Sequence, residues 1–198
     1  MIRTSEELKK AAANVSALLQ DMQNYLGRKN DPNAKFKFPR GFFTSASEIR
    51  DWFSFVNNET IRSNLSYAVM YIDLLTWLVI RTDLVAAPLD MVTKNGICVL
   101  GELCETLTHY VLVPKYMGKG NKKNNFRGRT DKLVELGVIS KPLKDDIDWI
   151  WQVREKVHIF LVGHLEWSHY TKKDFNRALR TFTKLRDELE ASKGIEWL

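Results

Sequence analysis

The sequence has little of what disulfide-bonded or metal-binding proteins depend on. It has two cysteines, Cys98 and Cys104, within a segment that reads as one helix, where a disulfide would be geometrically awkward. It has no CxxC pair, and its 4 histidines form no HxH or HxxxH pattern, so we expect no metal site and no cofactor. These absences indicate two buried, reduced thiols in a cytoplasmic protein.

The sequence also lacks a hydrophobic run long enough to be a clear membrane span. Its most apolar run, from Leu65 to Ile80, is shorter than the roughly 20 residues that a bilayer requires and contains Asp73. We interpret this run as a buried core helix. The first residues, MIRTSEE, do not combine a basic run with an apolar stretch, so we expect no signal peptide.

Helix breakers are few, and the apolar spacing is that of helices. Only 5 prolines and 10 glycines interrupt a chain that is 44% hydrophobic, and apolar residues recur at intervals of three and four. The sequence therefore predicts an all-α fold, an antiparallel helix bundle. The predicted helices, with ends placed by capping patterns, glycines and prolines, cover residues 5–26, 46–56, 59–81, 89–113, 130–136, 143–162 and 172–192.

Three local patterns position these helices. Thr4 with Glu7 and Ser45 with Glu48 have the spacing of capping boxes, and Asn58 is a plausible cap for the longest apolar helix. Inside the predicted helix 89–113, two glycines indicate close contacts with neighbouring helices, and Pro114 is expected to end it. These glycines are Gly96 and Gly101.

The first 57 residues are predicted to form an N-terminal helical extension, followed by the bundle over residues 58–198. Between the first two helices, residues 28–43 combine charges, prolines and aromatics, which is typical of an ordered loop packed by its own phenylalanines. These are Phe36, Phe38, Phe42 and Phe43. A subdomain boundary could also fall in this loop. An alternative interpretation is that aromatic residues of the extension make an oligomer contact.

Positive charge is concentrated in one loop. The chain has 30 lysines and arginines against 24 acidic residues, a net charge of +6, which permits a polyanionic partner without requiring one. Residues 115–129 are the most basic segment, and Tyr116 and Phe126 could stack on RNA bases there. A solvated surface loop is the other interpretation. The candidate RNA-binding residues are Lys115, Lys119, Lys122, Lys123, Arg127 and Arg129.

One pair of side chains on the penultimate predicted helix suggests chemistry. Arg154 and His158 are four residues apart, which places them one turn apart on one helical face. A guanidinium can hold a scissile phosphate, and an imidazole can move a proton near neutral pH, as metal-independent RNA cleavage requires. Taken alone, such a pair is also common between packed helices.

The string DKLVELGVISKPLKDDIDWIWQVREKVHIFLV (residues 131–162) resembles the core of the HEPN family of helical domains. The resemblance covers residues 60–192 and includes a closing helix that begins near Tyr170. It implies a metal-independent RNase that works in a toxin or antiviral-defence system, with a composite site at a homodimer interface. It also implies that Arg154 binds phosphate, that His158 is the general acid or base, and that Glu155 occupies the polar position between them.

A second interpretation is a HEPN-like module without catalytic activity. Three residues separate Arg154 from His158, whereas the family usually has four to six, and this spacing favours a non-catalytic module that binds RNA or a protein partner as an accessory subunit. The other histidines have less specific interpretations: His109 is expected to pack between helices, and His164 and His169 are expected in a loop after the motif helix. A purely structural bundle is the third interpretation.

Overall fold

The computed structural model describes residues 1–116, 125–156 and 169–192, with the backbone alone for residues 113–116. Every regular element in these residues is a helix, which confirms the predicted all-α class. The chain divides into two compact units, Met1–Arg40 and Gly41–Leu198.

The first unit consists of one long helix and a short turn. Helix α1 (Ser5–Leu26) begins at the predicted capping box, where the Thr4 hydroxyl accepts a hydrogen bond from the Glu7 amide at 3.1 Å. It ends at Gly27, whose φ of 57° is in the left-handed region that glycine adopts without strain. A 3₁₀ helix, η1 (Pro32–Ala34), follows. The ring centroids of Phe36 and Phe38 are 6.3 Å apart. Both side chains are exposed, so these two phenylalanines do not form a buried core for the loop.

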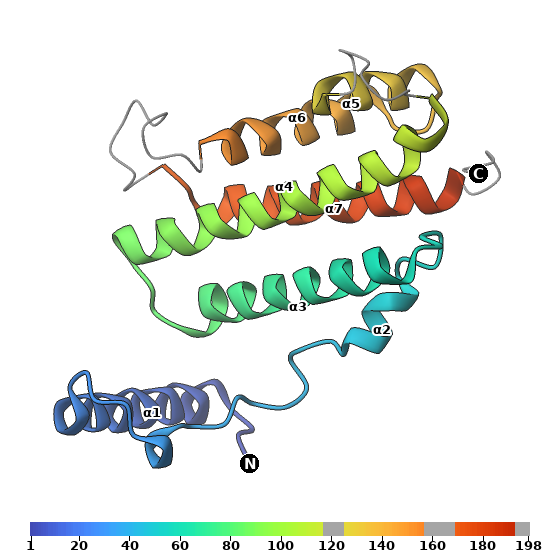
Figure 1. The fold of residues 1–198 in the computed structure, drawn as a ribbon. Helices are drawn as coiled ribbons and strands as arrows, with labels where there is room; N and C mark the ends of the chain where they lie inside the picture. The colour runs from blue at the N-terminus through green and yellow to red at the C-terminus, as the bar shows by residue number, and fades with distance from the viewer. Residues whose placement is uncertain (117–124, 157–168, 193–198) are drawn as a thin grey trace. The chain divides into compact units, whose positions relative to one another are not determined.

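The second unit is a bundle built around one central helix, α4. Figure 1 shows α3 and α6 running antiparallel to α4, with α7 beside it and in the same direction. Helix α4 contacts four other helices of the unit, α3, α5, α6 and α7. The helices of this unit are α2 (Ala46–Asp51), α3 (Glu59–Arg81), α4 (Ala86–Tyr116), α5 (Phe126–Glu135), α6 (Lys141–Glu155) and α7 (Lys172–Ala191).

The bundle begins at Gly41, earlier than the boundary at residue 58 that the sequence suggested. The reason is that helix α2 packs on α3. Ile49, Phe53 and Val56 are fully buried in the common core, and the Phe53 ring lies 6.4 Å from that of Phe182 in α7. Residues 41–57 are therefore part of the bundle.

Both interior glycines of α4 lie at close helix contacts, as predicted. A Cβ atom at Gly96 would be 2.4 Å from Cε2 of Phe175 in α7, a distance that real Cβ atoms essentially never show. A Cβ atom at Gly101 would be 3.2 Å from Cδ of Arg154 in α6. The missing side chains let α7 and α6 approach the central helix, and Gly101 gives the Arg154 side chain room to lie along it.

Several helix ends differ from the predicted ones. Helix α4 continues through Pro114 to Tyr116, although proline lacks the backbone donor that would bond to the carbonyl four residues earlier. Helix α5 begins at Phe126 rather than at residue 130, since the Asn125 side chain caps it by accepting from the Gly128 amide at 2.8 Å. Helix α6 ends at Glu155, before the predicted end at residue 162.

The structure describes both cysteines and the most apolar run of the sequence. Cys98 and Cys104 are both buried, as predicted, and no disulfide joins them. Within the described residues, α3 is the one helix long and apolar enough to cross a membrane by length and composition alone. One face of α3 is buried in the bundle, through Leu65, Val69, Ile72, Leu75 and Val79.

Candidate functional site

A cavity of about 690 Å³ opens between three helices of the bundle. Its lining residues come from the N-terminal end of α3, from one face of α4 and, in the case of Arg154, from α6. The residues of α4 recur at intervals of three and four, so they share one helical face. The cavity is lined by Asn58, Ile61, Glu102, Glu105, Thr106, His109, Tyr110 and Arg154.

The α3 wall is held by capping and by one tyrosine. The Asn58 side chain accepts a hydrogen bond from the Ile61 amide at 3.0 Å and so begins α3 beside the cavity. The Tyr110 hydroxyl accepts a hydrogen bond from the Asn57 amide at 2.8 Å. This second bond ties α4 to the segment before α3, which fixes the width of the cavity at that end.

Glu105 binds two arginines from different helices. Its Oε2 atom lies 3.0 Å from Nη2 of Arg154 in α6, and its Oε1 atom lies 3.5 Å from Nη2 of Arg129 in α5. The Arg129 side chain is 5% exposed and that of Arg154 is 29% exposed. Burial lowers the pKa of Arg129. The attraction to Glu105 and the hydrogen bond between them act in the opposite direction, but the pKa is lowered overall. The three groups carry one net positive charge.

A pair of stacked aromatic rings contacts the two arginines. The Trp151 and Phe126 rings stack with centroids 4.3 Å apart and an interplanar angle of 10°. The Arg154 guanidinium lies 4.6 Å from the Trp151 centroid, and that of Arg129 lies 5.8 Å from the Phe126 centroid. Cation–π attraction therefore supports both guanidinium groups and restricts the position of Arg154 at the cavity wall.

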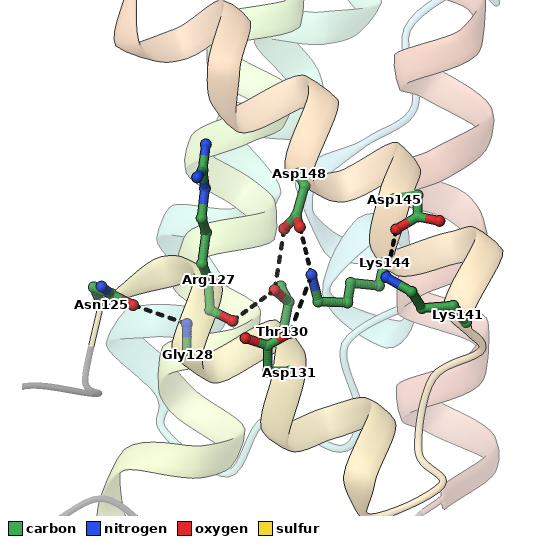
Figure 2. Close-up of polar contacts among 9 residues, drawn as sticks. All are labelled: Asn125, Arg127, Gly128, Thr130, Asp131, Lys141, Lys144, Asp145 and Asp148. Carbon is green, nitrogen blue, oxygen red and sulfur yellow. Dashed lines mark hydrogen bonds and ion pairs between the residues drawn. The ribbon is translucent and has the colours of Figure 1, made fainter.

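A polar cluster on the other side of α5 fixes that helix to α6 (Figure 2). The buried Lys144 ammonium binds Asp148 at 2.5 Å and Asp131 at 3.1 Å, and the Thr130 hydroxyl donates to Asp148 at 3.1 Å. Burial lowers the pKa of Lys144, but the hydrogen bonds and charges of the two aspartates raise it more, so that it is raised overall. Because Thr130 follows Arg129 directly, this cluster also determines where Arg129 meets Glu105.

The predicted catalytic residues are only partly in the described residues. Arg154 is in the last turn of α6 and lines the cavity. Glu155 is exposed and accepts a hydrogen bond from Nε1 of Trp151 at 3.1 Å, so its carboxylate faces along α6. His158 lies outside the described residues. Helix α6 ends at Glu155, one residue after Arg154.

The predicted RNA-binding residues have different environments. Lys119, Lys122 and Lys123 lie outside the described residues, and Lys115 is in the last turn of α4, where only the backbone is described. Arg127 is exposed, and Figure 2 shows its side chain extending away from the Lys144 cluster.

Two residues expected in the basic loop are instead part of the bundle core. Arg129 is buried in α5 against Glu105. Phe126 is 4% exposed and stacks on Trp151, so the expectation that it stacks on RNA bases from an open loop is wrong.

The other histidines differ in their surroundings. His109 is exposed on α4 and lines the cavity, so the prediction that it packs between helices is wrong. His169 is exposed and lines a smaller cavity of about 180 Å³ beside Tyr170 and Asp174. His164 lies outside the described residues.

Glu105 was not singled out in the sequence. Its partners are 24 and 49 positions away, so no local pattern indicates it. Within the described ranges no three His, Cys, Asp or Glu side chains are grouped as a metal site. Comparison with protein-family models, with curated proteins and with solved structures found no match to this chain.

Proposed function

We propose that this chain is a metal-independent endoribonuclease of the HEPN type, acting on single-stranded RNA in the cytoplasm as part of a toxin or antiviral-defence system. The observation that supports it best is the placement of Arg154. Its guanidinium is stacked on Trp151 and borders a cavity large enough for a nucleotide. The resemblance of residues 131–162 to the HEPN core supports the same assignment.

In the proposed reaction the 2′-hydroxyl of the substrate loses its proton and attacks the adjacent phosphorus atom. The bond from phosphorus to the 5′-oxygen of the next nucleotide breaks, which leaves a 2′,3′-cyclic phosphate, and the 5′-oxygen takes up a proton. Arg154 binds the phosphate and offsets the charge that develops on it. His158 transfers the proton as general acid or base, and Glu155 is the polar residue between them. The proposed assembly is a homodimer, in which Arg154 and His158 of both copies form one composite site.

The test is RNA cleavage in the presence of EDTA. Purified parent protein is incubated with labelled single-stranded RNA and compared with Arg154→Gln and His158→Ala, with His169→Ala as the matched control. We expect the parent and the control to cleave, and each site variant to lose at least about 100-fold in rate. Circular dichroism shows whether the variants are folded. Equal cleavage by folded site variants and parent would contradict the assignment.

The Glu105 ion pair favours a second candidate, a non-catalytic module that binds RNA or a protein partner as an accessory subunit. Arg154 already has a carboxylate partner, Glu105, at 3.0 Å. This candidate predicts RNA binding without cleavage. Binding should weaken when loop residues such as Lys122 and Arg127 are replaced, and should remain when His158 is replaced.

A further inference from the structure

Helix α1 has a stripe of apolar side chains that is open to solvent. None of the helix residues is buried, and the exposed fractions of Leu18 and Tyr25 are 64% and 86%. A continuous exposed apolar surface marks a place where another surface binds. The members of this stripe are Leu8, Ala11, Val15, Leu18, Met22 and Tyr25.

The stripe has the spacing of a coiled coil. Its members follow one another at alternating intervals of three and four residues along the whole of α1. They therefore occupy the first and fourth positions, a and d, of successive heptads, which keeps the stripe in contact with a partner helix along its length. A second copy of α1 has the same length and the same repeat, so it fits the stripe from end to end.

The two flanks of the stripe differ in chemistry, and this difference favours one orientation of the pair. The flank formed by the e positions is apolar, and the flank formed by the g positions is polar. Two parallel helices bring the g flank of one against the e flank of the other, whereas two antiparallel helices pair e with e and g with g. The e positions hold Ala12, Leu19 and Leu26, and the g positions hold Glu7, Asn14 and Asp21.

The apolar layers also match in the antiparallel orientation. When the two helices overlap over their full length, every a residue faces a d residue of the other copy. The short Ala11 then faces Met22, whose flexible side chain fills the space that alanine leaves. The other two layers pair Leu8 with Tyr25 and Val15 with Leu18.

The polar flanks match in charge in the same register. Glu7 is in the first turn of α1, and Arg28 is exposed just after the end of the helix. Each Glu7 therefore approaches Arg28 of the other copy, and Asn14 approaches Asp21, to which its amide can donate. The two lysines at residues 9–10 lie on the opposite face of α1 and do not meet the partner helix.

We propose that α1 binds the α1 helix of a second copy of this chain as an antiparallel coiled coil. The contact is separate from the proposed composite site, which uses Arg154 and His158, and the inference does not rest on RNA cleavage. A pair of short helices buries few side chains, so we expect association in the micromolar range and a dimer that exchanges with monomer.

The first experiment measures the mass of the full-length protein by sedimentation equilibrium between about 1 and 100 µM, a range that brackets micromolar association. The parent should be a reversible dimer. Leu18→Glu should weaken dimerisation by at least about 100-fold, because the pair buries both copies of the changed side chain. Ala13→Glu is the matched control and should dimerise as the parent does, because Ala13 is exposed on the opposite face of α1.

Both substitutions lie outside the bundle, and circular dichroism shows whether the variants are folded. A monomeric parent would overturn the proposal. A Leu18→Glu protein that dimerises as tightly as the parent would also overturn it, and would locate the contact on another surface.

Two cysteine variants test the orientation. The Leu8→Cys and Tyr25→Cys proteins are oxidised separately and as a mixture, in a chain whose own Cys98 and Cys104 are buried. The mixture should form a disulfide-linked dimer, because antiparallel helices bring residue 8 of one copy to residue 25 of the other. Neither variant should form one alone, since the introduced cysteines of its two copies would be about 25 Å apart.

Cross-linking of either variant alone as strongly as the mixture, or no cross-link in the mixture, would overturn the antiparallel pairing. These measurements contain no RNA, so failure of the ribonuclease assignment appears separately, in the RNA assay with EDTA.

Discussion

At the scale of single residues, the missing side chain at position 96 determines how closely α4 and α7 pack. The nearest atoms to a Cβ there belong to the ring of Phe175, which is 1% exposed and so has little space to move. A glycine inside a helix costs roughly 1 kcal/mol relative to alanine. The close packing of Phe175 must therefore contribute more than that cost.

We predict that Gly96→Ala destabilises the protein by about 1–3 kcal/mol, because overpacking outweighs the gain in helix propensity. The free energy of unfolding in urea, followed by circular dichroism, measures the effect. Adding Phe175→Leu should recover part of the loss by removing ring atoms from the contact. A Gly96→Ala protein as stable as the parent would show that α7 can move away without cost.

The two thiols give a prediction about pH. Burial raises the pKa of the Cys104 thiol from 9.0 to about 12. Between these values the unfolded chain has lost the thiol proton and the folded protein keeps it, so the free energy of unfolding falls as pH rises. Cys104→Ala should reduce this fall by at most about 1.4 kcal/mol per pH unit. Urea unfolding between pH 9 and pH 10.5 measures it, with Cys98→Ala, which retains Cys104, as the comparison.

At the scale of helices, α6 has two ion pairs between residues four apart, and the two pairs differ in burial. Lys144 is buried and binds Asp148, whose side chain is 17% exposed. Three residues earlier on the same helix, Asp145 binds Lys141, and both of these side chains are more than half exposed. Figure 2 shows the two pairs side by side on α6.

This difference predicts unequal effects of the same substitution. Asp148→Asn should cost about 2 kcal/mol, because it leaves the buried Lys144 with Asp131 alone and weakens the bond from Thr130. Asp145→Asn should change stability by less than about 0.5 kcal/mol, as is typical of exposed pairs. Chemical denaturation of both variants gives the comparison. Equal losses would mean that burial does not determine the strength of these pairs.

Local patterns predicted the starts of helices well, and long-range contacts explain what they missed. The capping residues Thr4, Ser45 and Asn58 act on amides within three residues, so the sequence alone places them. The burial of Phe126 depends on Trp151, and the surrounding glycines, asparagines and lysines read as a loop. Glu105 could not be singled out because neither of its partners is near it in the sequence.

At the scale of the whole molecule, the bundle has a core of its own that includes α2 and excludes α1. No residue of α1 is buried, whereas Ile49, Phe53 and Val56 are fully buried within the second unit. The boundary expected after these residues followed the extent of the HEPN resemblance, and an amphipathic segment outside it does not show which neighbour covers it. The unit boundary at Arg40 is thus a property of packing.

Two truncations test this boundary. A protein that starts at Gly41 should unfold at the same temperature as the full chain, within a few degrees, because its core is intact. A protein that starts at Asn58 should be strongly destabilised, since each buried apolar side chain that is lost contributes roughly 1.5–3 kcal/mol. Thermal unfolding by circular dichroism distinguishes them. Similar melting of both would place the boundary where the sequence suggested.

The central position of α4 has a consequence for how the bundle folds. Its two interior glycines weaken the helix by roughly 2 kcal/mol relative to alanine, and isolated helices are marginal in water even without such residues. The α4 peptide alone would therefore be largely unstructured. Because α4 contacts α3, α5, α6 and α7, its helical hydrogen bonds and the packing of the bundle form together. Its innermost amides should thus exchange with solvent only when the whole bundle opens.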